Sequence, residues 1–354
     1  GRTLALRPDM TIPTARVVGT RLYDQPMPLR LAYTGSVFRY EAPRAGRQHE
    51  FSQAGIELIG APGTVADAEV VALAAAALQA AGLPEFRITL GHVGFFRGLL
   101  AGLALPERLT AKLQSAVARK SEVELSLLLA EMPGLPPVAR QAVLTLPRLS
   151  GDAGVLAAAE AVCLNATMMR ALADLRSLAE LLDGYGVSPF VTYDLAEVRD
   201  LGYYTGITFE GFAPGLGFGL ISGGRYDTLI GHFGPASPAV GWALTLDRLL
   251  LARESQGMIE GEPRPDVLLG GLAGAAGAAA LGWAAAARER GLKVEVDPLG
   301  LEAEALWQAA AARGIARAVY AAAGGLLEVR DAHAAEWRAT PHGSWEEVAS
   351  WRSL

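Results

Sequence analysis

A stretch of alternating polar and apolar residues carries the side chains best suited to hold a polar ligand. Gln53 and Glu57 flank Gly55, and apolar residues stand between them. Successive side chains of a β-strand point to opposite faces, so Gln53 and Glu57 share one face of a strand. The pattern therefore predicts a polar face with acceptor and donor groups around a glycine. Alternation alone leaves open that this is the solvent-exposed face of an edge hairpin.

Arg39 and Glu41 are spaced in the same way in the preceding apolar and aromatic segment. In an antiparallel pair of strands we expect these two residues to lie close to Phe51 and Gln53. The hairpin would then gather an arginine, two glutamates and a glutamine on one face.

Two later segments combine glycines, tyrosines and an arginine. Residues 198–206 include Arg199, Tyr203 and Tyr204, and residues 222–227 include a Gly-Gly pair. Paired glycines let a ligand approach the backbone closely. The alternative is a hairpin whose glycines serve the turn and whose tyrosines pack in the core.

The N-terminal segment, residues 6–13, is predicted to be the end of a strand that leads into a helix. Thr11 is a suitable N-cap residue, and Pro13 suits the first turn. Asp9 is then placed beside the helix start, either as a ligand contact or as a cap that complements the helix dipole.

These residues must be positioned by a sheet assembled from distant parts of the chain. Residues 29–41 and 51–59 predict a hairpin around the loop 42–50. Three- and four-residue apolar spacing predicts helices over 65–81 and over most of 107–182, with breaks at 133–137 and 150–151. Strand character returns at 190–195, 203–212 and 218–222, and 239–253 runs from a strand into a helix.

The remaining chain predicts a second, smaller domain. Residues 261–265 resemble a linker, and short strands at 266–271, 293–297 and 316–321 alternate with Ala-rich helices. We therefore divide the chain into a core of residues 1–104 and 184–258, a helical insertion of residues 105–183, and an α/β domain of residues 265–354.

Composition bounds the class of protein. With 354 residues, 51% of them hydrophobic, the chain can bury a large core in two or three domains. A membrane span is not expected, because no uncharged apolar run reaches about 18 residues. The single Cys163 excludes an intrachain disulfide and fits the cytoplasm. A net charge of −6 gives no overall attraction for nucleic acid.

Several of these segments resemble one known family. Residues 38–41, 43–47 and 51–57 together resemble motif 2 of histidyl-tRNA synthetase, and 198–210 and 222–227 resemble its two histidine-binding signatures. Residues 238–249 are similar to motif 3 of class II synthetases. Order and spacing agree over about residues 3–253. The resemblance implies an α+β fold with an antiparallel sheet flanked by helices, a helical insertion and a degenerate anticodon-binding-like C-terminal domain.

The family has catalytic members and a non-catalytic branch, the regulatory subunit of ATP phosphoribosyltransferase, which acts in the first step of histidine biosynthesis. Residues 6–16 are similar to the regulatory branch, since the synthetases usually have Glu-Gly at Asp9-Met10. Gly202 replaces an acid of the synthetases, and His49 stands where they generally have a second arginine. The resemblance therefore favours a regulatory subunit that binds histidine for feedback control and is required for the activity of a short catalytic subunit. Histidyl-tRNA synthetase itself, or a histidine-binding scaffold with another partner, stays as an alternative.

The resemblance also implies a set of ligand contacts. Asp9, Thr11 and Gln53 would hold the histidine ammonium group. Arg199 and Gln53 would hold the carboxylate, and Glu57 with Tyr204, beside Tyr203, would hold the imidazole. A further set corresponds to the ATP site of the synthetases and is either vestigial or a structural remnant: Arg39, Glu41, Phe51 and Arg248.

If the chain is a regulatory subunit, further properties are expected of it. No catalytic residue, metal or required cofactor is expected, although ATP in the vestigial site is an open alternative. The expected partners are the short catalytic subunit, L-histidine and a second copy of the chain within a hetero-oligomer, without tRNA or membrane. The family places its dimer-forming motif 1 before residue 3, so we expect this sequence to begin inside the domain.

Overall fold

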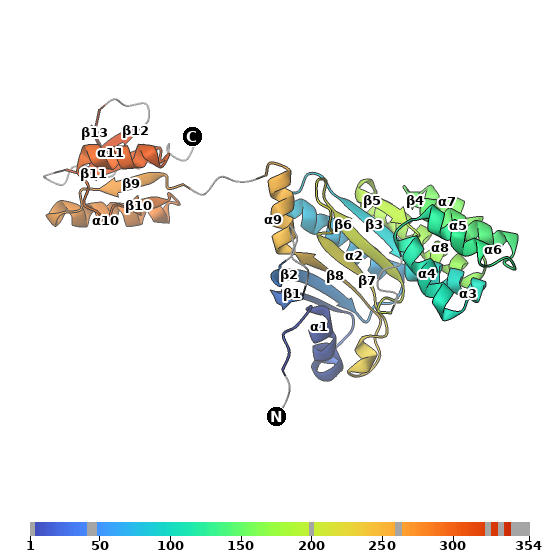
Figure 1. Ribbon diagram of the computed structural model, residues 1–354. Helices are drawn as coiled ribbons and strands as arrows, with labels where there is room; N and C mark the ends of the chain where they lie inside the picture. Colours follow the sequence, from blue (N-terminus) through green and yellow to red (C-terminus); the bar gives the residue numbers. More distant parts are fainter. Residues whose placement is uncertain are drawn as a thin grey trace. The chain divides into compact units, whose positions relative to one another are not determined.

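The chain forms two compact units, residues 1–259 and residues 260–354. The structure is a computed structural model (Figure 1). It describes residues 4–40, 48–197, 202–258, 264–322, 327–331 and 336–340. The ligand-binding candidates all belong to the first unit.

An eight-stranded sheet in the order β1-β2-β8-β7-β6-β3-β5-β4 forms the centre of the first unit. Its neighbouring strands are antiparallel except for the parallel pair of β3 and β5. The strands are β1 (Leu29–Phe38), β2 (Glu50–Ile59), β3 (Arg87–His92), β4 (Ser150–Gly151), β5 (Val191–Asp194), β6 (Ile207–Phe212), β7 (Ile221–Arg225) and β8 (Ala239–Thr245). The central strands therefore come from both sides of the helical insertion.

Helices of the first unit cover the sheet and form the insertion. They are α1 (Thr11–Val17), α2 (Thr64–Ala80), α3 (Val93–Leu103), α4 (Glu107–Ala118), α5 (Glu122–Ala130), α6 (Pro137–Thr145), α7 (Val155–Glu160), α8 (Ala166–Gly184) and α9 (Leu246–Ser255). A π-helical turn at Val18–Leu22 extends α1, and 3-10 turns lie at Leu146–Arg148, Ser188–Phe190 and Ile230–His232.

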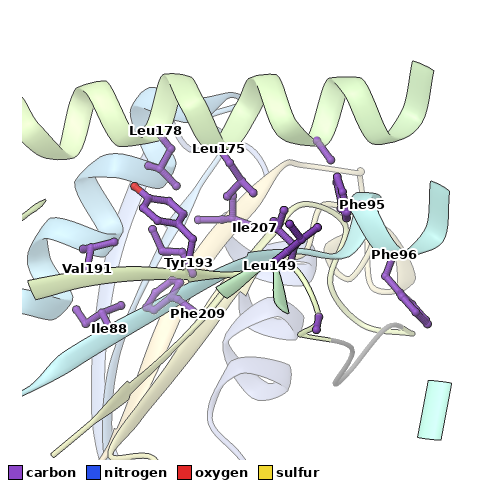
Figure 2. Packing of buried hydrophobic residues seen from close by; sticks show 14 of the residues in the cluster. Ile88, Phe95, Phe96, Leu149, Leu175, Leu178, Val191, Tyr193, Ile207 and Phe209 are labelled. Atoms are coloured by element: carbon purple, nitrogen blue, oxygen red, sulfur yellow. The ribbon is translucent and has the colours of Figure 1, made fainter. Parts of the chain in front are cut away.

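The core lies between the sheet and its helices. Asn165 precedes helix α8 as its N-cap, and its side chain accepts the Met168 N–H at 3.1 Å. Leu175 and Leu178 point from α8 toward Tyr193 of β5 (Figure 2). Both leucines are fully buried, and each buried side chain of this size stabilises the fold by about 1.5–3 kcal/mol.

The observed elements confirm the predicted fold class and refine the predicted strands. Strand β1 ends at Phe38, and residues 203–206 precede β6 instead of belonging to it. The strand predicted over 218–222 is displaced to Ile221–Arg225, because the hydrogen-bonded pairing with β6 begins at Gly211 and Ile221. Strand β3 and helix α3 were not predicted. One continuous hydrophobic cluster joins the insertion to the sheet, and the division of the unit into core and insertion stays a prediction.

The second unit has a five-stranded sheet in the order β10-β9-β11-β12-β13. Its elements are β9 (Val267–Gly270), α10 (Gly274–Glu289), β10 (Val294–Val296), α11 (Ala303–Ala312), β11 (Arg317–Ala321), β12 (Leu327–Asp331) and β13 (Arg338–Thr340). The three predicted strands are present as β9, β10 and β11. Two hydrophobic clusters, composed only of residues of this unit, form its core.

Two structural features are absent from the described residues. No helix among them has both the length and the apolar composition needed to cross a membrane. They also contain no group of three or more His, Cys, Asp or Glu side chains arranged to hold a metal ion.

Candidate functional site

A cavity of about 420 Å³ lies on the face of the large sheet that carries Gln53 and Glu57. Its size falls in the usual range of small-molecule pockets, about 300–1,000 Å³. Along β2 the lining extends from Phe51 to Glu57, roughly 20 Å at about 3.3 Å per residue. Its polar side chains are Asp9, Thr11, Arg39, Gln53, Glu57, Tyr203, Tyr204, Glu210, Ser222, Tyr226, Thr245 and Arg248.

The polar face of β2 is buried. Glu57 is 2% exposed and Gln53 is 5% exposed, so the alternative of a solvent-exposed hairpin face is wrong. Strand β2 is an inner strand, paired with β1 on one side and β8 on the other. A polar residue in such a place needs hydrogen-bond partners, because burying an unpaired polar group or charge costs several kcal/mol.

Two tyrosines supply partners for the Glu57 carboxylate. The Tyr226 hydroxyl donates to Glu57 Oε2, and the Tyr33 hydroxyl donates to Oε1 at 3.3 Å. Gly241, opposite Glu57 on β8, makes room for the carboxylate, since a Cβ there would overlap it. The carboxylate is therefore held at a defined place on the cavity wall.

Burial dominates the electrostatics of Glu57. Removal from water raises its pKa from an ordinary value of 4.5 to about 7, against the opposing effect of hydrogen bonds from Tyr226, Thr11 and Tyr33. The negative charge of Asp9 contributes to the same rise. Burial first, and the charge of Glu57 second, also raise the pKa values of the hydroxyls of Tyr33 and Tyr226. These phenols therefore stay protonated donors at neutral pH.

The start of α1 brings Asp9 and Thr11 to the cavity. The prediction that Thr11 is the N-cap is wrong: Thr11 is the first helical residue, and Met10 precedes it as cap without a side-chain bond. Asp9 Oδ1 accepts the Ile12 N–H at 2.9 Å, so Asp9 both caps the helix and lines the cavity. Thr11 instead turns its hydroxyl toward Tyr33, at 3.4 Å.

Gln53 ties the helix start to the sheet. Its Oε1 accepts the Met10 N–H at 3.2 Å. A carbonyl oxygen has two lone pairs, and the amide group also has two N–H donors. Gln53 can therefore make this bond and still contact a ligand.

Tyr203 and Tyr204 both line the cavity. The Tyr203 ring stacks on the Tyr226 ring with centroids 5.4 Å apart, and it meets the Tyr204 ring edge-on at 4.8 Å. Arg97 of α3 donates to the Tyr204 carbonyl at 2.9 Å. The Tyr204 ring lies against Gly224, where a Cβ would come within 2.8 Å of it. The glycine pair thus serves close aromatic packing at the cavity wall.

The other end of the cavity carries arginines and aromatic rings. The guanidinium of Arg39 lies 5.5 Å from the centroid of the Phe51 ring, and that of Arg248 lies 5.2 Å from the centroid of Phe218. Arg39 also donates to the Pro8 carbonyl at 2.6 Å, and Arg248 donates to the Gly219 carbonyl at 2.9 Å. These contacts orient both guanidinium groups beside the cavity.

The prediction that Arg39 lies close to Phe51 is confirmed, although the observed register does not pair the two residues. Phe51 pairs with Val37, and Gln53 pairs with Gly35. Arg39 follows β1, and its N–H donates to the His49 carbonyl at 2.9 Å. Its side chain nevertheless reaches the Phe51 ring. Glu41 and Arg199, the two remaining candidates, lie outside the described residues.

Sequence reasoning missed Tyr33 and Tyr226, which contact the central carboxylate. Tyr226 directly follows Gly223, Gly224 and Arg225, and it contacts Glu57, which is 169 residues away in the sequence. Tyr33 stands opposite Gly55 in the hairpin. The apolar alternation of β1 could have placed Tyr33 on the face of Glu57 only once the register was known.

The charges of the cavity are separated along β2. Asp9 and Glu57 favour a cationic or N–H-bearing group at one end, whereas the other end carries Arg39 and Arg248 together with the carboxylate of Glu210 beside Gly219. Glu57 with its two phenols is a directional acceptor in a dry environment. The arrangement can therefore select a ligand by hydrogen bonds at one end and leaves room for a second group at the other.

The comparisons with known proteins agree with this geometry. Residues 1–249 match the family model described as histidyl-tRNA synthetase, and fold and site together define a protein of that class II family. A curated relative from Symbiobacterium thermophilum, named ATP phosphoribosyltransferase regulatory subunit, is 45% identical over 90% of this chain and 79% of its own. The chain belongs to the family of ATP phosphoribosyltransferase regulatory subunits within that class.

Solved structures give the same result. One from Bacillus halodurans C, described as an ATP phosphoribosyltransferase regulatory subunit/histidyl-tRNA synthetase, is 34% identical, with a TM-score of 0.74 over 86% of this chain and 77% of its own. Histidyl-tRNA synthetase from Nostoc sp. PCC 7120 has a TM-score of 0.80 over 99% of this chain and 84% of its own. At 23% identity, that likeness concerns the fold alone. The predicted assignment to the regulatory, non-catalytic branch is confirmed by the named relatives.

Proposed function

We propose that this regulatory subunit binds L-histidine in the cavity around Glu57 and uses it for feedback control of a catalytic ATP phosphoribosyltransferase subunit. The observation that carries the proposal is the buried Glu57 carboxylate, held by the hydroxyls of Tyr226 and Tyr33 at the end of the cavity. An imidazole N–H would donate to this carboxylate, and Tyr204 would contact the other ring nitrogen.

The rest of the amino acid would extend along β2. Asp9, Thr11 and Gln53 would hold the ammonium group, and Gln53 with Arg199 would hold the carboxylate. Paired polar groups of this kind reject analogues that lack the matching hydrogen bond, because the site would then keep an unpaired buried group. This gives a reason for a regulatory protein to retain a buried acid.

Regulation requires that histidine binds two conformations of the complex with unequal affinity. Coupling of this kind is typically about 1–3 kcal/mol, or about 5- to 150-fold in affinity. We propose that the partner is the short-form catalytic subunit, that this chain is required for its activity, and that the regulatory chains pair as a homodimer within the hetero-oligomer. A cytoplasmic location belongs to the same proposal.

Calorimetry of histidine binding tests the pocket. The Glu57→Ala variant should bind histidine about 10- to 100-fold more weakly, because a hydrogen bond to a charged group contributes about 1.5–3 kcal/mol. Glu85→Ala removes the same charge from an exposed position and should leave the affinity unchanged. Equal affinity of wild type and the Glu57 variant would disprove the pocket assignment.

A second candidate function is histidyl-tRNA synthesis, favoured by the retention of Arg39, Phe51 and Arg248 at the far end of the same cavity. Guanidinium groups suit the phosphates of a nucleotide, and the Phe51 ring suits stacking on an adenine. When bound, ATP would supply the adenylyl group that activates the histidine carboxylate, with pyrophosphate as the leaving group. These residues fit such a ligand, so ATP binding there is part of the second candidate.

One set of assays separates the candidates. The regulatory function predicts that the purified chain stimulates the short transferase and that histidine suppresses the stimulated activity. The Glu57→Ala variant should still stimulate but lose the response to histidine. A synthetase instead predicts histidine-dependent exchange of pyrophosphate into ATP. Histidine binding with neither activity would point to a scaffold for another partner.

A further inference from the structure

An ion pair lies behind the cavity, on the opposite face of the sheet from Glu57. Arg225 ends β7, and Asp67 lies in the first turn of α2. Both residues are buried, at 6% and 3% exposure. Arg225 donates through Nε to Asp67 Oδ1 at 2.9 Å, and its Nη2 lies 2.7 Å from the same oxygen. Burial of two charges is costly, so a retained pair of this kind calls for a reason beyond stability.

The guanidinium of Arg225 also binds groups around it. It donates to Asp227 Oδ1 at 3.0 Å and to the carbonyls of Ala61 and Gly63 at 3.3 and 3.1 Å. Two further titratable groups, Asp227 and His92, act on the ion pair: the charge of each changes the pKa of Asp67. A lysine could not reach so many acceptors, since only the planar fork of arginine presents five N–H donors.

The hydrogen bonds of Arg225 and Asp227 lie on both sides of Tyr226 and directly after Tyr204. The Arg225 carbonyl accepts the Thr205 N–H at 2.7 Å, directly after Tyr204. The Asp227 N–H donates to Thr205 Oγ1 at 3.0 Å, and Asp227 Oδ1 accepts the Ala239 N–H at 3.1 Å. Tyr226 stands between Arg225 and Asp227 and points to the other face, where its hydroxyl meets Glu57.

We propose that Arg225 and Asp67 are positioning residues of the histidine site, which fix the Tyr226 hydroxyl against Glu57 and so set the selectivity of the site for an imidazole. The inference rests on the proposed histidine site for its ligand, but the positioning of Tyr226 is testable in the protein alone. Arg225 acts through Tyr226 and contacts no ligand.

The first test follows the titration of Glu57 without ligand, by carboxyl ¹³C NMR with Glu57→Gln to identify the signal. The groups that face Glu57 are Tyr33 of β1, Tyr226, Tyr203, and Asp9 and Thr11 at α1. Arg225→Lys should raise the Glu57 midpoint as Tyr226→Phe does, because both remove the donated hydrogen bond. In the Tyr226→Phe background, Arg225→Lys should add nothing, as expected of two changes that act through one contact. Asp67→Asn is a milder variant and should give a smaller shift of the same sign.

The second test measures histidine and a ring-methylated histidine by calorimetry. Arg225→Lys should weaken histidine binding about 10-fold or more and reduce the preference over the methylated analogue. Arg140→Lys is the matched control, since Arg140 lies in the insertion and donates to the carbonyls of Leu129 and Met132 at 3.0 and 2.9 Å. It should lower stability and leave both the Glu57 midpoint and the preference unchanged.

The outcomes distinguish the two proposals. If Arg225→Lys lowers stability as Arg140→Lys does but leaves the Glu57 midpoint and the preference unchanged, Arg225 is merely structural and the inference is overturned. If the wild type binds no histidine while the midpoint shifts as expected and not additively with Tyr226→Phe, the histidine function fails and the positioning role stands.

Discussion

At the scale of single residues, Glu57 is the most informative side chain of this protein. It is an acid on an inner strand, with two phenol donors and with Asp9 as a second negative charge nearby. The free energy of its ionisation is therefore set by burial more than by charge pairing. A ligand that donates a hydrogen bond, or carries positive charge, would relieve this cost.

The raised pKa of Glu57 has a consequence for stability. Between its ordinary pKa of 4.5 and its folded pKa of about 7, the folded protein holds a proton that the unfolded chain releases, so stability falls as pH rises through this window. The difference of 2.5, at about 1.4 kcal/mol for each pH unit, amounts to about 3–4 kcal/mol in total.

We expect Glu57→Gln to remove this pH dependence. Urea unfolding at pH 4.5, 6 and 8 should show that the free energy of unfolding of the variant, relative to that of the wild type, increases by about 3 kcal/mol over that range. Wild-type histidine affinity should decline below pH 7, because a protonated Glu57 is a poorer acceptor. A stability difference between the two proteins that is independent of pH would contradict the assignment.

At the scale of elements, the site depends on how the sheet is covered on its other face. Helix α8 closes the core over β3, β5 and β6 through fully buried leucines such as Leu175 and Leu178 (Figure 2). The same helix belongs to the predicted insertion, and it packs on α2 and α3. Helix α3 carries Arg97, which binds the Tyr204 carbonyl. The insertion is therefore connected to the cavity wall by packing.

Leu175→Ala should lower the free energy of unfolding of the first unit by about 2–5 kcal/mol, since the loss of a fully buried side chain leaves a cavity. Met169→Ala on the same helix removes a side chain that is 41% exposed and should change stability by less than about 0.5 kcal/mol. Denaturant unfolding followed by tryptophan fluorescence measures both. Equal effects of the two substitutions would show that α8 does not form the core described here.

At the scale of the whole molecule, the chain contains two units with separate cores. The hydrophobic clusters of the second unit include Leu306 of α11, which is fully buried against its own sheet. None of the described cavity residues belongs to that unit. Ligand binding and the stability of the second unit are therefore expected to be separable.

Leu306→Ala should destabilise the second unit by about 2–5 kcal/mol and leave histidine affinity unchanged. Hydrogen exchange read by mass spectrometry should show faster exchange in β9 and α11 and unaltered exchange in β2. Leu281→Ala, at an exposed position of α10, serves as the control for substitution within this unit. A fall in histidine affinity with Leu306→Ala would refute the separation.

Local sequence patterns determined which residues of this protein share a face. The period of two placed Gln53 and Glu57 together, because strand geometry depends only on neighbouring residues. The motifs of residues 38–57, 198–227 and 238–249 identified the family for the same reason: their order and spacing are properties of the chain itself. Arg199 and Glu41 remain predictions, since they lie outside the described residues.

Only the tertiary structure decided what those faces meet. The alternation of polar and apolar residues in β2 could not distinguish a solvent-exposed face from a buried one. The burial of Glu57 depends on β8 and on Tyr226, which is 169 residues away in the sequence. The capping of α1 by Asp9 in place of Thr11 depended on where the helix starts against the sheet. The role of Arg225 behind Tyr226 likewise required α2 to be docked on β7, since hydrogen bonds and burial between distant segments exist only after the chain has folded.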